Sequence, residues 1–201
     1  MTLAMHNTML FKQKWEVRRV FNVKWWLRGI ILGFIVGLVV SVSYAALPTA
    51  KEYQVKAVYL FNFSKFIRWP DSAFGFDNAR PIRICVLGKN PFENFARVVR
   101  GKKIKGRPVR VLNLRDFRNS RSCHILFVSK SEEGHQAAIL NYTRQYPILT
   151  VSDIKRFVTR GGMIQFYIRS NKVRFMIDPR TLREVGISAS ANLLRVAKIV
   201  R

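Results

Sequence analysis

The segment from Lys51 to Pro70, KEYQVKAVYLFNFSKFIRWP, constrains the fold most because it concentrates large apolar side chains in one short stretch. Apolar residues recur on two adjoining helical stripes, and Pro70 disfavours helical geometry in the residue before it, so we expect a helix that ends at Trp69. A core helix is the simplest interpretation. The number of large rings exceeds what one inner face needs, so we also expect some of them to contact a partner. The candidates are Tyr59, Phe63, Phe66 and Trp69.

Apolar runs alternate with helix-start signals through the rest of the chain. The expected strands are residues 82–87, 109–114, 123–129 and 147–151, followed by a hairpin of residues 163–168 and 172–177. The expected helices are residues 90–100, capped by Asn90, residues 131–146, residues 154–159, capped by Ser152 and Asp153, and a closing helix from 178 to 199, broken near 186–188. This alternation predicts an α/β fold: three layers, a mostly parallel sheet flanked by helices, a C-terminal β-hairpin and a closing helix.

Residues 1–45 have the order of a secretory signal peptide. Six basic residues and one acid precede an uncharged apolar run at residues 29–42, and small residues follow it. We expect cleavage after Ala45, which leaves residues 46–201 as a periplasmic domain. The apolar run is shorter than the roughly 20 residues that span a bilayer. Because Trp25 and Trp26 suit a membrane interface, an uncleaved inner-membrane anchor that faces the periplasm is the alternative.

The net charge of +25 favours an anionic partner. Residues 46–201 keep 30 basic and 10 acidic residues, a net charge of +20. An exported domain has little access to nucleic acid, so we exclude that partner. The expected anionic neighbours are lipid head groups at a membrane surface, cell-wall polymers or an acidic protein surface. A generally basic proteome would give the same charge with no function attached to it.

The two cysteines of the chain, Cys85 and Cys123, lie in the first and third expected strands. Common doubly wound strand orders place the first strand beside the third, so the two sulfurs can meet across neighbouring strands. In an oxidising compartment such a pair is expected to form a disulfide. The alternative is two free buried thiols, which requires their Cα atoms to be too far apart for a bridge.

Catalytic and metal-binding motifs are missing from the sequence of residues 46–201. His124 and His135 lack a second His, Cys or acid at metal-ligand spacing. The Gly88-Lys89 pair follows a strand but lacks the remaining residues of a phosphate loop. We therefore predict a non-enzymatic protein with no catalytic residue, no metal site and no cofactor.

Five segments in order resemble the YfiR-like family of exported bacterial proteins: KAVYLFNFSKFIRWP, IRICVLGKNPF, CHILFVSKSE, GGMIQFYIRSNKVRFMID and VGISASANLLRVAKIV. The resemblance runs from about Tyr53 to Val200. It implies a small α/β domain that is often a homodimer, with a structural disulfide at Cys85 and Cys123. Well-known members carry a second cysteine pair late in the chain. This sequence has no cysteine after Cys123, so redox switching by that pair is not expected here.

The best-known members of that family look like periplasmic repressors. They bind the periplasmic part of an inner-membrane diguanylate cyclase and hold cyclic-di-GMP synthesis low, and redox or envelope stress relieves the repression. By resemblance we expect such a regulator, acting through the rings of the first helix and through the C-terminal helix. One alternative is a periplasmic small-molecule-binding module with a pocket near Gly88 and Ser129. Another is a membrane-anchored protein that associates with lipid or cell wall through its charge.

Overall fold

The computed structural model describes residues 47–75, 77, 79–92 and 94–200. The expected signal segment, residues 1–45, lies outside this part of the chain. Within the described residues an eight-stranded sheet has the order β10-β8-β7-β6-β5-β2-β4-β3. Its strands are β10 (Lys198–Ile199), β8 (Lys172–Ile177), β7 (Ile164–Arg169), β6 (Leu149–Ser152), β5 (Ile125–Val128), β2 (Ile82–Leu87), β4 (Arg107–Leu114) and β3 (Lys103–Ile104).

Most neighbouring strands of this sheet run parallel, as expected. The antiparallel pairs are β7 with β8 and β3 with β4. The C-terminal hairpin is confirmed: Phe166 pairs with Phe175, and the turn residues Ser170 and Asn171 both have positive φ, which a tight two-residue hairpin turn requires. Two further short strands, β1 (Ile67–Arg68) and β9 (Ser188–Ala189), pair antiparallel outside the main sheet.

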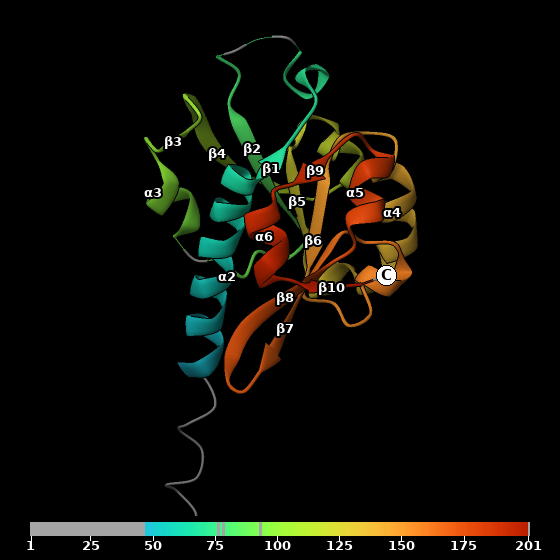
Figure 1. Ribbon diagram of the computed structural model, residues 1–201. Coiled ribbons are helices and arrows are strands. Elements are labelled where there is room, and N and C mark those ends of the chain that lie inside the picture. The colour runs from blue at the N-terminus through green and yellow to red at the C-terminus, as the bar shows by residue number, and fades with distance from the viewer. Residues whose placement is uncertain (1–46, 76, 78, 93, 201) are drawn as a thin grey trace, which may run out of the picture. The chain divides into compact units, whose positions relative to one another are not determined.

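Helices cover the sheet on both faces and make the three expected layers. Figure 1 shows α2 (Leu47–Phe66) and α4 (Gln136–Thr143) on opposite sides of the sheet, with α3 (Phe95–Val99) beside β3 and β4. Successive side chains of a strand point to opposite faces. Ile84 and Val86 of β2 therefore join the buried cluster of α2, whereas Leu87 joins the cluster of Ile139 on α4.

The expected first helix ends earlier than predicted. It stops at Phe66 instead of Trp69, because Ile67 and Arg68 leave the helix to pair with β9. The Phe66 carbonyl then accepts a hydrogen bond from the Ser190 amide. Long-range pairing, which local sequence does not encode, decides this boundary.

Three other helices are shorter than predicted. The helix expected from residue 90 begins at Phe95, because the Asn90 side chain accepts a hydrogen bond from the nearby Phe92 amide instead of capping a helix. The helix expected at 131–146 is a 3₁₀ turn, Lys130–His135, followed by α4, and the one expected at 154–159 is a 3₁₀ turn at Val158–Arg160. The closing helix is split into α5 (Pro179–Glu184), capped by Asp178 as expected, and α6 (Ala191–Val196).

The expected disulfide joins Cys85 and Cys123, whose Cα atoms lie 6.0 Å apart. Cys85 lies in β2, and Cys123 lies two residues before β5, the neighbouring parallel strand. Both residues are buried in the cluster on the α4 side of the sheet. The bridge therefore fixes β2 against β5 at the centre of the fold.

Replacing both cysteines, Cys85→Ala with Cys123→Ala, is expected to lower the free energy of unfolding by about 4 kcal/mol, because the bridge closes a loop with a sequence separation of 38. Urea unfolding of residues 46–201 measures the loss. Reductant should lower the stability of the wild type to that of the variant and leave the variant unchanged. Equal stability of the variant and the oxidised wild type would contradict the prediction.

Candidate functional site

Helix α2 exposes one apolar stripe to solvent. Val55, Val58 and Phe66 are 40%, 58% and 37% exposed, and their spacing places them on one side of the helix. Leu60 and Phe63 of the same helix, and Ile67 directly after it, are at most 1% exposed. Apolar side chains that face water on a helix whose other side is buried are typical of a contact surface.

A groove between α2 and α3 extends this stripe. It has a volume of about 300 Å³ and is lined mainly by apolar side chains, among them Val58 and Phe61 of α2 and Val98 of α3. The ammonium groups of Lys65 and Lys102 lie 5.1 and 5.9 Å from the centre of the Phe61 ring, so the groove has a basic rim. We call the set Val55, Val58, Phe61, Phe66 and Val98 the α2–α3 surface.

The four rings predicted to contact a partner have different environments. Phe66 lies on the α2–α3 surface. Phe63 lies in the core, 1% exposed, with its ring centre 5.2 Å from that of Phe175 in the hairpin. Tyr59 is half-buried against the same Phe175 ring, at 5.5 Å. Trp69 is half-buried, and its indole N–H donates to the His124 carbonyl at 3.2 Å.

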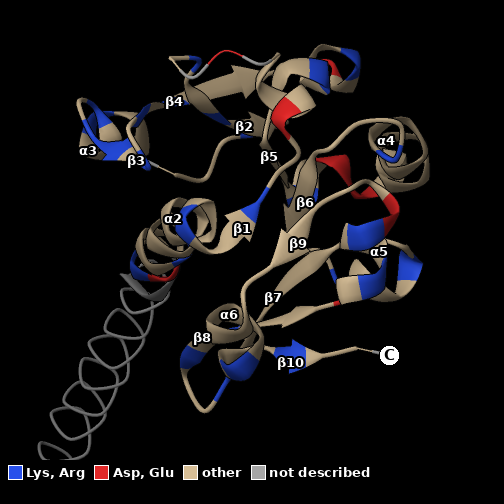
Figure 2. Ribbon diagram, turned by 45° about the horizontal axis from the view of Figure 1, so that its top comes forward, with Lys and Arg blue, Asp and Glu red and all other residues tan. Residues whose placement is uncertain are grey.

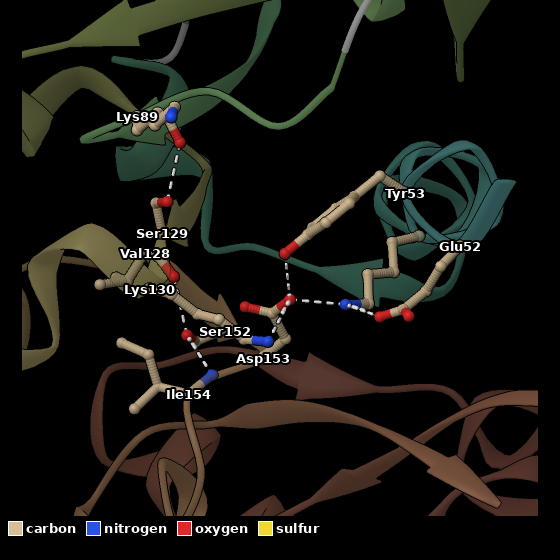
Figure 3. Close-up of polar contacts among 10 residues, drawn as sticks. Glu52, Tyr53, Lys89, Val128, Ser129, Lys130, Ser152, Asp153 and Ile154 are labelled. Atoms are coloured by element: carbon tan, nitrogen blue, oxygen red, sulfur yellow. Dashed lines mark hydrogen bonds and ion pairs between the residues drawn. The ribbon is translucent and has the colours of Figure 1, made fainter. Parts of the chain in front are cut away.

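A buried ion pair holds α2 on the sheet. The Lys56 ammonium donates to Asp153 Oδ2 at 2.5 Å, and the side chains of both residues are at most 4% exposed. Asp153 follows β6 directly, at the carboxyl end of the parallel strands. Figure 3 shows the Tyr53 side chain pointing from α2 to Asp153, where its hydroxyl donates to Oδ2 at 2.8 Å, and Glu52 beside the helix, where it forms a second ion pair with Lys56.

Sequence reasoning missed this pair. It assigned Asp153 to a helix cap, whereas the Ser152 hydroxyl accepts the hydrogen bond from the Ile154 amide and leaves the carboxylate of Asp153 for α2. The available signal was Lys56 itself, which stands one turn before Leu60 on the buried stripe and therefore needs a buried acid. Burial, followed by the hydrogen bond to Asp153, raises the pKa of Tyr53 above its usual value, so the hydroxyl remains a donor.

The strand ends near Gly88 and Ser129, where a small-molecule pocket was the alternative, make close contacts with each other. The Ser129 hydroxyl donates to the Lys89 carbonyl at 2.7 Å, and Ser131 Oγ accepts from the Lys89 amide at 2.9 Å. Gly88 has a φ of +82°, and a Cβ at this position would lie 2.4 Å from Ser131 Oγ. The two serine hydroxyls and the backbone of Lys89 therefore satisfy one another's hydrogen bonds at this edge of the sheet.

His124 is a buried ring at the start of β5, stacked on Phe74 with ring centres 4.4 Å apart. Its Nδ1 accepts a hydrogen bond from the Arg83 amide at 3.1 Å. Burial, with smaller contributions from the charges of Arg83, Arg107 and Arg80, lowers the pKa of His124 to about 4, and a backbone interaction with Ala73 offsets part of this shift. The ring is therefore neutral in the folded protein at neutral pH.

Two further observations concern the described residues only. No group of three or more His, Cys, Asp or Glu side chains gathers there in a geometry suited to a metal ion. Among the helices of this part of the chain, none combines the length and hydropathy needed to cross a bilayer.

The substitution Lys56→Met is expected to lower the free energy of unfolding by about 3 kcal/mol, because it leaves the buried carboxylate of Asp153 with only the exposed Lys130, 3.9 Å away, as a cation. Urea unfolding measures the effect. The exposed Lys51, on the same helix, provides the control Lys51→Met, which should change stability by less than about 0.5 kcal/mol. Adding Asp153→Leu to Lys56→Met should recover part of the loss; no recovery would contradict a role for the unpaired charge.

The neutral His124 ring is expected to make stability depend on pH. Between pH 6.5 and about 4 the unfolded chain binds a proton at this ring that the folded chain does not, so the free energy of unfolding falls as the pH falls through this window. The pKa of this ring is 6.5 in the unfolded chain and about 4 in the folded chain, and this difference corresponds to about 3 kcal/mol of unfolding free energy. His124→Asn retains an acceptor for the Arg83 amide without titrating, so its unfolding free energy should fall less over the same window. Equal slopes for variant and wild type would contradict the prediction.

Comparisons with known proteins identify the family to which this sequence belongs. A family model described as YfiR/HmsC-like matches residues 53–198, from α2 to β10. No curated protein sequence matches the chain. One similar solved structure is that of a conserved domain protein from Vibrio cholerae O1 biovar El Tor strain N16961, with 8% sequence identity and a TM-score of 0.45. That match covers 59% of this chain and 54% of the other, so the chain spans about half the length of that protein.

The family match includes nearly all of the described residues, among them both cysteines, Lys56 and Asp153. It also agrees with the resemblance seen in the five sequence segments. The chain belongs to the YfiR/HmsC-like family.

Proposed function

We propose that this protein is an exported, non-enzymatic regulator. It binds the periplasmic part of an inner-membrane signalling protein, represses a diguanylate cyclase and so lowers cyclic-di-GMP. Residues 1–45 direct export, and residues 46–201 act in the periplasm. Membership of the YfiR/HmsC-like family is the observation that carries this proposal, because the family is named after a regulator of this type. The disulfide also supports it, since such bridges persist in oxidising compartments.

The proposed contact with the partner is the α2–α3 surface. A partner segment that fits it would insert apolar side chains into the groove and place acidic groups beside Lys65 and Lys102 on its rim. Of the four predicted rings, Phe66 would touch the partner directly, and Tyr59 and Trp69 would present their exposed edges. Phe63 would support the helix from beneath.

The proposed mechanism is a shift of population in the partner. A cyclase that exists in active and inactive arrangements is held inactive by a protein that binds the inactive one more tightly. A rigid binding surface favours this effect, because little affinity is lost in ordering it. The buried contacts of Lys56 and Leu60 give α2 such rigidity.

The substitution Val58→Glu is expected to abolish repression, because it buries a charge in an apolar contact. Loss of a central contact of this kind costs at least about 2 kcal/mol, or about 30-fold in affinity. The matched control is Ile168→Glu, since Ile168 is 48% exposed on the hairpin and lies outside the α2–α3 surface. Both variants should reach the periplasm at wild-type levels, which immunoblotting of periplasmic extracts checks.

Cellular cyclic-di-GMP and co-purification with an inner-membrane diguanylate cyclase measure the outcome. Deleting the gene should raise cyclic-di-GMP; the wild type and Ile168→Glu should restore the low level, and Val58→Glu should not. Unchanged cyclic-di-GMP after deletion would refute the proposed function. Full repression by Val58→Glu would refute the proposed surface alone.

A further inference from the structure

A second cavity lies at the amino-terminal edge of the parallel strands. It has a volume of about 620 Å³ and is bounded by residues that precede or begin β2, β5 and β6, together with the 3₁₀ turns Asp71–Phe74 and Phe117–Ser122. This volume is within the range of small-molecule sites. The cavity shares no residue with the groove between α2 and α3.

Four arginines, two from each of two segments, line this cavity, and none of the described residues that line it is acidic. Arg80 precedes β2, Arg83 lies in β2, and Arg118 and Arg121 come from the 3₁₀ turn. Arg118 is paired with Asp116 at 3.4 Å. Within the described part of the chain, the other three have no carboxylate within ion-pair distance. Three uncompensated guanidinium groups thus converge on one hollow.

The remaining lining complements these charges. Ser72, Asn119 and Ser122 provide neutral hydrogen-bonding side chains, and Tyr146 and Pro147 form an apolar wall. The Arg121 guanidinium lies 5.7 Å from the centre of the Tyr146 ring, which holds it near this wall. Polar donors beside a small apolar wall are typical of a site that binds an anion attached to an organic group.

The positive field of this region reaches the neighbouring core. The charges of Arg83 and Arg80, both in the cavity lining, contribute to the low pKa of the buried His124 ring, after the larger effect of burial. Positive charges that repel a proton from a buried ring attract an anion in the adjacent cavity. The geometry and the electrostatics therefore agree.

We propose that this cavity binds a small phosphate-bearing anion. Guanidinium groups are planar forks that hold phosphate oxygens with two hydrogen bonds each, and several of them favour a ligand with more than one negative charge. The ligand can be a free phosphorylated molecule or the head group of an anionic lipid, since both present the same oxygens. This site goes beyond the proposed repression and stands or falls independently of it.

Isothermal titration of residues 46–201 with pyrophosphate tests the site. Figure 2 shows lysine and arginine over most of the elements, so about 150 mM salt is needed to screen their general attraction. We expect one bound pyrophosphate per chain. Arg83→Gln with Arg121→Gln should weaken it at least tenfold, since charge-assisted bonds are lost from two sides of the cavity. The matched control is Arg169→Gln with Arg174→Gln, which removes two charges from the hairpin and should retain wild-type affinity.

The melting temperature of each variant confirms that it folds. If the first variant does not fold, Arg80→Gln with Arg118→Gln replaces it, because these two arginines line the same cavity. Equal weakening by the hairpin variant, or no saturable binding by the wild type, would overturn the proposal. A free ligand is the source if pyrophosphate binds but vesicles containing phosphatidic acid do not. A lipid head group is the source if the vesicles bind, pyrophosphate displaces them and the cavity variant loses both.

Discussion

The buried ion pair between Lys56 and Asp153 decides which side of helix α2 faces the core and which side faces solvent. Helix α2 carries apolar side chains on nearly every side, so hydrophobic burial alone would allow it to pack in several rotations about its axis. A buried ammonium has no such freedom, because it must meet a buried carboxylate. Glu52, on α2 itself, can pair with Lys56 in any rotation, but the buried carboxylate of Asp153 stands at the end of β6, so the pair with Asp153 forms in one orientation of the helix. That orientation sends Leu60 and Phe63 into the core and leaves Val55, Val58 and Phe66 in solvent.

The sequence predicted those parts of the fold whose signals are local or periodic. β2 and the β7–β8 hairpin are found where apolar runs and turn residues placed them, and the neighbouring positions of β2 and β5 followed from a common strand order, which also placed the disulfide. Prediction from the sequence failed where a distant segment of the chain binds a backbone or side-chain group that local structure would otherwise use. Ile67 leaves α2 because β9 offers it a pairing partner, and Asp153 leaves its expected cap because Lys56 needs a charge. The sequence also did not predict the exposed stripe of α2, since composition does not reveal which apolar residues of this helix face outward.

The two ends of the parallel strands have opposite characters, and this reverses the usual expectation for α/β sheets. Ligands of open sheets commonly bind beyond the carboxyl ends of the strands. Here Tyr53 and Lys56 of α2 occupy that end through Asp153, and Ser129 and Ser131 bond to the backbone of Lys89. The amino end instead carries the arginine-lined cavity. Anchoring α2 at one edge thus leaves the other edge for an anion.

The position of the disulfide limits how a redox signal can act on this chain. The bridge is buried on the α4 side of the sheet, whereas α2 packs on the other side. Reduction therefore cannot alter the α2–α3 surface by direct contact, and the late cysteine pair of well-known relatives has no counterpart after Cys123. Reduction can affect α2 only indirectly, through β2. This strand carries Cys85 on one face, and on the other face it carries Ile84 and Val86, which belong to the buried cluster of α2. Loss of the bridge would reach α2 only when β2 loses its register with β5, so reduction acts on this domain through its stability and not through a switch at its surface.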